Sequence, residues 1–390
     1  MNHQPMTARE NPLQVVMLRS NPVAPDPRVS KTAASLAAAG YHVTVFCWDR
    51  RQQSLNVSKL PGVTFIRRQI RGQYASGLKN LLPLLRWQAA LFSWLFSQRR
   101  KIDVIHACDF DTVLPAFLVS KVFDIPLVYD IFDFYADNIH SMSPTVARIV
   151  ASLDRWIISR VDGVILADEN RIQQIQPSIP KRMVVIYNTP PDSYKSGTDA
   201  PAGKFTIAYA GQLLVNRGLL ELIAAIGRHP EWQLNLAGFG GDVEQIMDAA
   251  KPFDNISLSG VVPYEEALQK MSEAHVIYAL YDPSLPNHRY ASPNKLFEAM
   301  MLAKPIIVAC GTGIDRLVER EAIGLVVPYG NTNALEQALI FLSQNPDEAL
   351  EMGMRARKCY ENSYKWSKME CELLAFYRQV LESQGLTVIS

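Results

Sequence analysis

The chain lacks several features that would place it in a specialised class of protein. It has five cysteines in 390 residues, with no paired or CxxC spacing, which argues for a reducing compartment and against a disulfide framework or zinc site. The formal net charge is +1, so no global basic field for nucleic acid is expected. No run approaches the roughly eighteen apolar residues of a spanning helix. The polar start, MNHQPMTARENP, lacks the apolar core of a secretion signal. The sequence therefore predicts a cytoplasmic protein with local anion-binding surfaces.

Length and apolar pattern predict two α/β domains. The chain is too long for one typical core. Short β-branched runs alternate with helical patterns, which is typical of parallel βαβ units covered on both faces. The Pro- and Gly-rich stretch 191–204 is the expected linker between doubly wound domains 1–190 and 205–365, and 366–390 carries an amphipathic helix. Ligands are expected beyond the carboxyl ends of the strands, in a cleft between the domains. The expected strands are 13–18, 42–47, 63–67, 104–106, 126–130, 163–167 and 183–187, then 206–209, 233–237, 256–259, 276–279, 305–309 and 324–327.

The segment YASPNKLFEAMMLAKP contains the most informative helix start. Ser292 suits an N-cap and Pro293 the first helical position. Free amides and the helix dipole at such a start make a site for a phosphate. Glu298, one turn further in, is placed to grip ribose hydroxyls. Spacing alone leaves open a capped surface helix with a solvated glutamate and lysine. The amides expected to point out of the helix are those of Asn294, Lys295 and Leu296.

Two glycine-containing loops follow strands of the second domain. In GQLLVNRGL, Gly211 at a strand end and Arg217 six positions later can bring backbone and guanidinium to a pyrophosphate. A plain βα loop with an exposed arginine is the alternative. In GFGG, Gly238 and its neighbours lack the full GxGxxG pattern, so this cluster alone is weak evidence.

Two acidic segments of the first domain could have either a functional or a purely structural role. In SNPVAPDPR, Asp26 lies between two prolines and Arg28 enters a helix, so they could face an anion or an acceptor, or pair with each other. Asp109 and Asp111 spell DxD, which in another architecture binds a metal. Here they begin a helix, where acidic residues suit the dipole, so a metal is not expected.

The stretch LLPLLRWQAALFSWLFSQRR is broadly apolar and is flanked by basic residues. One interpretation is peripheral contact of 81–101 with an anionic membrane, which would guide a lipid-linked acceptor. The alternative is a buried crossover helix of the sheet.

The order of these segments resembles the family 4 glycosyltransferases. GQLLVNRGL, LAGFGG, NISLSGVVPYEEAL, SPNKLFEAMMLAKPIIV and IGLVVPYGNTNAL follow one another as in that family. The first half matches as well, in DPRVSKTAASLAAAGYHVTVF, DVIHACDFDTVLPAFLVSKVFDIPLVYDIFDFY, DGVILADENRI and VVIYNTP. The resemblance spans about 13–381. It implies a GT-B fold with an acceptor-binding first domain, a nucleotide-sugar-binding second domain, and a C-terminal helix that returns to the first domain.

The resemblance also implies an activity: metal-independent, retaining transfer of a sugar from a UDP- or GDP-linked donor, with no further cofactor. The acceptor would be a glycan or a lipid-linked saccharide in cell-surface polysaccharide synthesis. Independently of the resemblance, the composition of 81–101 leads us to expect peripheral contact with the inner face of the cell membrane, and the net charge leads us to expect no nucleic-acid partner. Arg217 would neutralise the diphosphate, Glu298 would bind ribose, and the backbone of Val261 and Val262 would hold the base. The implied sites are Arg217, Asp133 and Glu298 for catalysis; Gly211, Gln212, Arg217, Gly238, Phe239, Val261, Val262, Tyr290, Ser292, Asn294, Lys295, Leu296 and Glu298 for the donor; and Asp26 and Arg28 for the acceptor.

Three positions depart from the family pattern. Gln212 replaces an arginine, Tyr290 replaces the first glutamate of the paired-glutamate motif, and Phe132, beside Asp133, replaces a histidine. These departures affect the donor-sugar contacts rather than the nucleotide contacts. They keep two alternatives open, which are a non-catalytic glycan-binding or partner subunit and a sugar-nucleotide epimerase.

Overall fold

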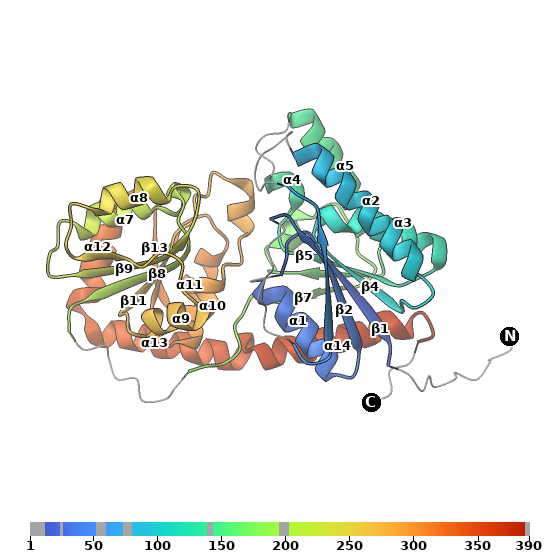
Figure 1. Ribbon diagram of the computed structural model, residues 1–390. Coiled ribbons are helices and arrows are strands. Elements are labelled where there is room, and N and C mark those ends of the chain that lie inside the picture. Colours follow the sequence, from blue (N-terminus) through green and yellow to red (C-terminus); the bar gives the residue numbers. More distant parts are fainter. Residues whose placement is uncertain are drawn as a thin grey trace. The chain divides into compact units, whose positions relative to one another are not determined.

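The computed structural model describes residues 12–23, 26–51, 60–72, 80–138, 143–194 and 203–386. It divides into two compact units, shown in Figure 1: Met1–Tyr187 with Met369–Ser390, and Asn188–Lys368. Most of the predicted linker, 195–202, lies outside the described residues. Within them, no helix has the length and apolar character needed to cross a membrane.

The first unit is built on a parallel sheet with strand order β3-β2-β1-β4-β5-β6-β7. Every residue of β4, β5 and β6 is buried, because helices cover both faces of a parallel sheet. The strands are β1 (Gln14–Arg19), β2 (His42–Asp49), β3 (Val63–Gln69), β4 (Val104–Cys108), β5 (Leu127–Ile131), β6 (Gly163–Leu166) and β7 (Met183–Val185). The helices of this segment are α1 (Pro27–Ala38), α2 (Leu81–Gln98), α3 (Phe110–Phe123), α4 (Tyr135–Asn138), α5 (Pro144–Ile158) and α6 (Arg171–Gln174).

Alternate side chains of this sheet form the core under α2, α3 and α5. Val16, Leu18, Ile105 and Ala107 pack in one cluster with buried residues of these three helices, because successive strand residues point to opposite faces. Figure 1 shows the three helices along the same side of the sheet. Stacked aromatic rings fill this core, with Trp87 at 5.4 Å and 5.7 Å from the ring centroids of Trp48 and Phe46.

The C-terminal helix α14 (Trp366–Glu382) contributes its residues from Met369 onward to the first unit. Gly163 on β6 makes room for it, since a Cβ at this position would lie 2.5 Å from Cζ of Phe376. Tyr377, also on α14, is fully buried and its hydroxyl lies 2.5 Å from Nδ1 of His106 on β4. The helix is therefore anchored by close packing and by a buried polar contact.

The second unit has a parallel sheet with strand order β10-β9-β8-β11-β12-β13. Its strands are β8 (Thr206–Gln212), β9 (Gln233–Phe239), β10 (Ile256–Leu258), β11 (Val276–Ala279), β12 (Ile306–Ala309) and β13 (Gly324–Val327). Its helices are the 3-10 turn η2 (Val215–Arg217), α7 (Leu219–Ile226), α8 (Val243–Ala250), α9 (Tyr264–Ser272), the 3-10 turn η3 (Pro286–Tyr290), α10 (Asn294–Met301), α11 (Ile314–Glu321), α12 (Thr332–Gln344), α13 (Pro346–Cys359) and the π turn η4 (Tyr360–Tyr364).

The prediction of two doubly wound α/β domains is confirmed, and each predicted strand is present with shifts of a few residues at its ends. In both sheets the strand order reverses, at β1/β4 and at β8/β11. Loops at the carboxyl ends of strands flanking such a reversal diverge and leave room for a ligand. Asp26 and Asp109 follow β1 and β4 in the first unit, and Arg217 and Lys295 follow β8 and β11 in the second.

Candidate functional site

Arg217 is held at the end of η2 in the second unit. Its guanidinium carbon lies 4.0 Å from the ring centroid of Tyr281, and its Nη1 lies 3.0 Å from Nε2 of His288. Nδ1 of His288 lies 3.0 Å from the carbonyl oxygen of Asp282, so the tautomer with hydrogen on Nδ1 leaves Nε2 to accept from Arg217. Among the described residues no carboxylate lies within ion-pair distance of this arginine. Arg217 is therefore oriented but not neutralised.

Lys295 also lies near Tyr281. Its Nζ is 5.8 Å from the ring centroid of Tyr281 and 4.6 Å from that of Tyr209, and the residue is buried. Burial lowers the pKa of Lys295, but the oxygens of Tyr209 and Tyr281 outweigh it and the net shift is upward. The ammonium has no carboxylate within ion-pair distance in the described part of the chain. Two cations, Arg217 and Lys295, thus share one aromatic neighbour.

The glycines of the β8 and β9 loops serve close packing. A Cβ on Gly211 would lie 2.8 Å from Nζ of Lys295, so glycine leaves space for the ammonium at the end of β8. A Cβ on Gly238 would lie 1.7 Å from the carbonyl oxygen of Gly211, and glycine there lets β8 and β9 pair as far as Gln212 and Phe239. Both predicted glycines therefore lie at the site. Gly238 acts by allowing the backbone of Gly211 on β8 to approach closely.

The start of α10 differs from the prediction in two details. The N-cap is Pro293, in extended conformation, and the side chain of Ser292 makes no capping bond. The hydroxyl of Ser292 is buried and has no hydrogen-bond partner among the residues that the structure describes, and the carbonyl of Ser292 accepts from the side chain of Asn188 at 3.1 Å. The amide of Leu296 donates to the carbonyl of Pro293, so it does not point out of the helix. The prediction of Ser292 as cap and of a free Leu296 amide is wrong, because the extended Pro293 starts the helix one residue later.

Two backbone amides at this helix start are free of intrahelical hydrogen bonds, as predicted. Those of Asn294 and Lys295 have no acceptor among the described residues, as expected for the first positions of a helix. Asn294 is exposed, whereas the Lys295 side chain is buried beside Tyr209 and Tyr281. The unpartnered hydroxyl of Ser292 adds a third polar group.

Glu298 is buried one turn further along α10. Its Oε1 accepts a hydrogen bond of 2.9 Å from the hydroxyl of Tyr264, the first residue of α9. Burial and the neighbouring carboxylate of Glu298 raise the pKa of Tyr264 well above its ordinary value, so its hydroxyl keeps its proton. The loop before Tyr264 carries Val261, which is 75% exposed, and Val262, which is half-buried. The predicted ribose and base residues are thus linked by a tyrosine.

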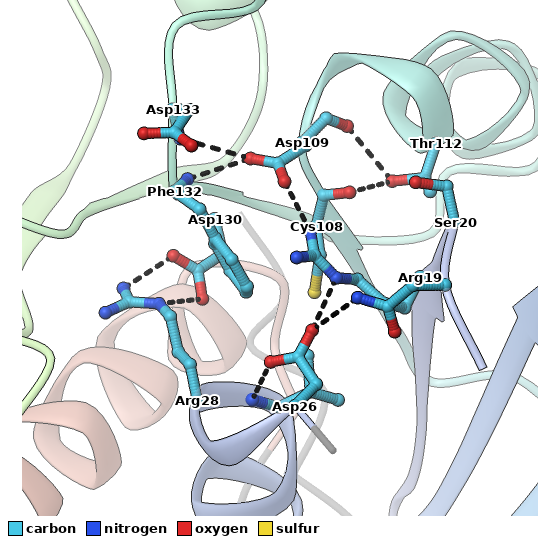
Figure 2. A network of polar contacts seen from close by, with 12 residues as sticks. Arg19, Ser20, Asp26, Arg28, Cys108, Asp109, Thr112, Asp130, Phe132 and Asp133 are labelled. Carbon is cyan, nitrogen blue, oxygen red and sulfur yellow. Dashed lines mark hydrogen bonds and ion pairs between the residues drawn. The ribbon is translucent and has the colours of Figure 1, made fainter. Parts of the chain in front are cut away.

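Figure 2 shows the polar network at the carboxyl ends of β1, β4 and β5 in the first unit. Arg19 pairs with Asp26 at 2.8 Å and with Asp109. Oδ1 of Asp109 accepts from the amides of Phe132 at 2.9 Å and Asp133 at 3.4 Å. Asp109 has φ +64° and ψ 168°, a region almost reserved for glycine. Its backbone is therefore strained in order to aim the carboxylate at the turn after β5.

Opposing effects set the pKa of the Asp109 carboxyl. Burial raises its pKa to about 7, although Arg19 and the amide of Phe132 act in the opposite direction. The ring of Phe132 lies 4.1 Å and 4.9 Å from the guanidinium carbons of Arg19 and Arg28. Asp133, nearly half exposed, pairs with buried Arg171 at 2.8 Å. Of these residues only Asp133 was predicted as catalytic, and it is the one with an accessible carboxylate.

The two predicted acceptor residues make internal contacts. Asp26 is the N-cap of α1, accepting from the amide of Val29 at 3.3 Å. Arg28 donates to both carboxylate oxygens of Asp130 and to the carbonyl of Ile186. Burial alone would raise the pKa of Asp130, but Arg28 and His106 outweigh it and hold it below its ordinary value. Both residues are buried, so an acceptor could reach only their immediate surroundings.

One buried group has the composition of a metal site. The ligand atoms of His106, Cys108 and Asp130 lie within 4.8 Å of one another. However, Arg28 engages both oxygens of Asp130 and Tyr377 engages Nδ1 of His106. Burial raises the pKa of the Cys108 thiol well above its ordinary value, which disfavours the thiolate that a metal requires. We interpret this group as an internal polar contact between the sheet, α1 and α14.

Several residues of these sites carried no sequence signal. Tyr281, His288 and Tyr264 are ordinary residues of strand ends, turns and helix starts, and only tertiary contacts reveal their link to Arg217, Lys295 and Glu298. Asp109 did carry a signal, as an acidic residue directly after a buried strand. Gln212 is exposed at the end of β8, and Tyr290 is half-buried at the end of η3.

Comparison with known proteins identifies the class. The "Glycosyl transferase 4-like domain" family matches 24–189, and the "Glycosyl transferases group 1" family matches 204–345. Together these matches cover most of both units. The chain belongs to the family 4, group 1 glycosyltransferases, and its two parallel sheets are those of the GT-B fold.

The relatives in sequence are distant. An uncharacterised glycosyltransferase of Haemophilus influenzae is 23% identical over 57% of this chain and 64% of its own length. Glycogen synthase of Mycobacterium tuberculosis is 22% identical over 68% of this chain and 66% of its own. Alpha-D-kanosaminyltransferase of Streptomyces kanamyceticus is 20% identical, with 75% and 83% covered. The chain thus spans slightly less than two thirds of the length of the first two.

Solved structures share the fold at low identity. Sucrose-phosphate synthase of Thermosynechococcus elongatus has a TM-score of 0.79 at 19% identity, with 95% of this chain and 100% of that chain covered. HepE of Anabaena, solved with UDP and glucose, has a TM-score of 0.69 at 14% identity, with 94% and 99% covered.

Proposed function

We propose that this glycosyltransferase moves a sugar from a UDP- or GDP-linked donor to a glycan or lipid-linked saccharide of a cell-surface polysaccharide. Transfer retains the anomeric configuration and needs no metal. The observation that carries this proposal is the pair of cations, Arg217 and Lys295, beside Tyr281 with no carboxylate partner in the described residues. Two oriented cations beside free helix-start amides call for a multiply charged anion such as a diphosphate.

The charge of the reaction fits this arrangement. Breaking the bond between the anomeric carbon and the diphosphate oxygen leaves negative charge on the phosphate and positive character on the sugar ring. Preorganised cations stabilise the departing phosphate more strongly than the intact donor. Gln212 stands where the family has an arginine, so one positive charge is missing there. Lys295 supplies a positive charge instead, because its ammonium lies against Gly211, the residue before Gln212. Arg217 adds a bidentate fork.

The nucleoside would be bound by α10 and by the loop before α9. Glu298 keeps Oε1 on Tyr264, and in this proposal the carboxylate also accepts from a ribose hydroxyl. The exposed loop residue Val261 and the half-buried Val262 would hold the base through backbone groups. Phe239, 56% exposed at the end of β9, offers an apolar edge to the donor.

The acceptor side rests on the turn after β5. Asp133 has the accessible carboxylate of that turn, and Asp109 holds the amides of Phe132 and Asp133. In our proposal Asp133 hydrogen-bonds the reacting sugars and no protein carboxylate forms a covalent intermediate. Asp26 and Arg28 would shape this region through Arg19 and Asp130 rather than by direct contact.

Known relatives support the donor class. HepE was solved with UDP and glucose and with UDP-glucose, and the names of glycogen synthase and alpha-D-kanosaminyltransferase also describe sugar transfer.

The proposal is tested by nucleotide binding and release. A thermal-shift screen of UDP, GDP, ADP and dTDP should single out one nucleotide, with about 2.7 kcal/mol of stabilisation at a hundredfold excess over its Kd. Nucleotide release from the matching sugar donor should fall about 10²–10³-fold in Arg217→Ala. It should be unchanged in Arg228→Ala, an exposed arginine of the same unit, and unaffected by EDTA. Absence of release in the wild type, or equal release in Arg217→Ala, would falsify the catalytic assignment.

A further inference from the structure

Three helices of the first unit expose apolar side chains to solvent on one side. We propose that the outward faces of α2, α3 and α5, here called the three-helix face, dock on the surface of an anionic phospholipid bilayer. The proposal does not depend on the catalytic assignment, because none of these side chains belongs to the donor site in the second unit.

On α2 the exposed apolar residues lie on a different face of the helix from the buried ones. Trp87, Leu91 and Leu95 are fully buried in the core. An adjacent face presents Leu81, Leu82, Leu85, Phe92 and Phe96, which are 40–58% exposed. Leu81, Leu85, Phe92 and Phe96 follow helical spacing, so they form one stripe. A crossover helix that only covered its sheet would not need this second apolar stripe beside its buried one.

The neighbouring helices continue this stripe. On α3, Leu118 is 55% and Val122 71% exposed. On α5, Ile149 is 62% and Trp156 45% exposed, and Leu153 lies one turn from each. All three helices pack on the same side of the sheet.

Aromatic contacts join the three helices into one surface. Phe96 of α2 meets Phe123 of α3 at 5.6 Å between ring centroids. Phe117 of α3 meets Trp156 of α5 at 5.2 Å. The exposed stripes are therefore contiguous across α3 rather than isolated. Contiguous exposed apolar surface is uncommon on soluble proteins and marks a docking site.

The charge of the three-helix face selects the partner. The sequence from Leu81 to Lys101 contains no aspartate or glutamate. The only acidic residue of α5, Asp154, is fully buried under Tyr129. Asp124, at the end of α3, is the exposed acid nearest the stripe in sequence. The exposed basic residues on or just beyond the three helices are Arg86, Arg100, Lys101, Lys121, Arg148 and Arg160.

Several basic side chains lie beside the aromatic rings. The guanidinium of Arg160 lies 4.4 Å from the ring centroid of Trp156, and that of Arg99 lies 4.2 Å from Phe96. Nζ of Lys121 lies 5.6 Å from Phe117. Peripheral membrane helices place aromatic rings in the headgroup layer and basic side chains beside them, where the cations contact lipid phosphates. Protein interfaces, in contrast, are depleted in lysine at their centre.

Vesicle flotation tests the proposal with the full chain. Wild type should float with vesicles of phosphatidylcholine and phosphatidylglycerol, and at least tenfold less with phosphatidylcholine alone. Raising salt from about 0.1 M to about 1 M should weaken binding, because the Debye length shrinks from about 10 Å to about 3 Å. Leu85→Glu with Ile149→Glu should reduce flotation at least tenfold.

Matched variants separate the face from general effects of charge. Leu350→Glu with Met354→Glu alters two apolar residues of α13, 47% and 55% exposed, and should float like wild type. Arg100→Gln with Lys121→Gln should reduce flotation while leaving the apolar stripe intact. This variant still tests the proposal if Leu85→Glu with Ile149→Glu unfolds. All variants should release nucleotide from a soluble donor at the wild-type rate.

Three results would overturn the proposal. The first is a wild type that does not float with anionic vesicles. The second is equal flotation of the wild type and both three-helix-face variants. The third is a concentration-dependent dimer in light scattering that Leu85→Glu with Ile149→Glu abolishes without any vesicle binding, since that result would assign the face to a second copy of the chain.

Discussion

The hydroxyl of Tyr264 donates a hydrogen bond of 2.9 Å to the buried carboxylate of Glu298. The tyrosine begins α9, directly after the loop of Val261 and Val262, whereas the glutamate lies on α10. This contact joins the segments proposed for the base and for the ribose. It also occupies one carboxylate oxygen, so the orientation of Glu298 is set before any ligand binds.

Tyr264→Phe should weaken nucleotide binding with little change in turnover at saturating donor. One lost hydrogen bond to a carboxylate corresponds to roughly 1.5–3 kcal/mol, or about 10–150-fold in Kd, as an upper range. Calorimetric titration of UDP and GDP measures it. In a double-mutant cycle with Glu298→Gln the effects should be non-additive. Additive effects, or an unchanged Kd in Tyr264→Phe with an intact fold, would contradict the positioning role.

Asp109 should control turnover near neutral pH. Its pKa of about 7 makes protonation significant at that pH, and the protonated carboxyl binds Arg19 and the amides of Phe132 and Asp133 more weakly. Sugar transfer should therefore fall as the pH drops below about 7. The profile of Asp109→Asn should be flatter and lower throughout. A wild-type limb that persists in Asp109→Asn would assign the titration to another group.

Asp154 should make the fold less stable as the pH rises. Burial raises its pKa to about 7 from an ordinary 3.8, and its Oδ2 has no partner. The unfolded chain therefore loses this proton first, and the contribution of Asp154 to the free energy of unfolding decreases from about pH 4 to about pH 7. Each unit of pKa difference corresponds to about 1.4 kcal/mol.

Asp154→Asn should remove this loss. We compare the free energy of unfolding of Asp154→Asn with that of the wild type at each pH. This difference should be more favourable to the variant at pH 8 than at pH 5, by at least about 1 kcal/mol. Urea unfolding at the two values measures the difference. Exposed Asp248 on α8 supplies the control, since Asp248→Asn should show the same difference from wild type at both values. A gain of equal size at pH 5 and pH 8 would mean that Asp154 does not titrate in this range.

Gly163→Ala should loosen the anchoring of α14. The added Cβ would lie 2.5 Å from Phe376 and 2.9 Å from Val380, so the helix must shift. Overpacking of this kind costs about 1–3 kcal/mol in the free energy of unfolding. Gly241→Ala, where the nearest neighbour is 3.8 Å away, should change it by less than about 0.5 kcal/mol. Thermal unfolding compares the two, and equal melting temperatures would show that α14 tolerates the extra methyl.

The sequence by itself determined the strands, the doubly wound class and the family. These depend on local patterns: apolar runs of strand length, glycine and proline at their ends, and ordered motifs such as SPNKLFEAMMLAKP. It also predicted Arg217, Lys295 and Glu298 as site residues, because each follows a strand end or a helix start. The cap at Ser292 failed for a local reason, since an extended Pro293 is equally compatible with the same letters.

Only the tertiary structure decided which side chains accompany these residues. Tyr281 contacts Arg217, which is 64 residues away in the chain, and Tyr264 holds Glu298, which is 34 residues away. Arg19 pairs with Asp109, which is 90 residues away. Parallel strands bring such distant segments to one sheet edge, and their contacts depend on strand order and register rather than on spacing along the chain. Likewise, the apolar stripe of α2 became a surface only when α3 and α5 were found beside it.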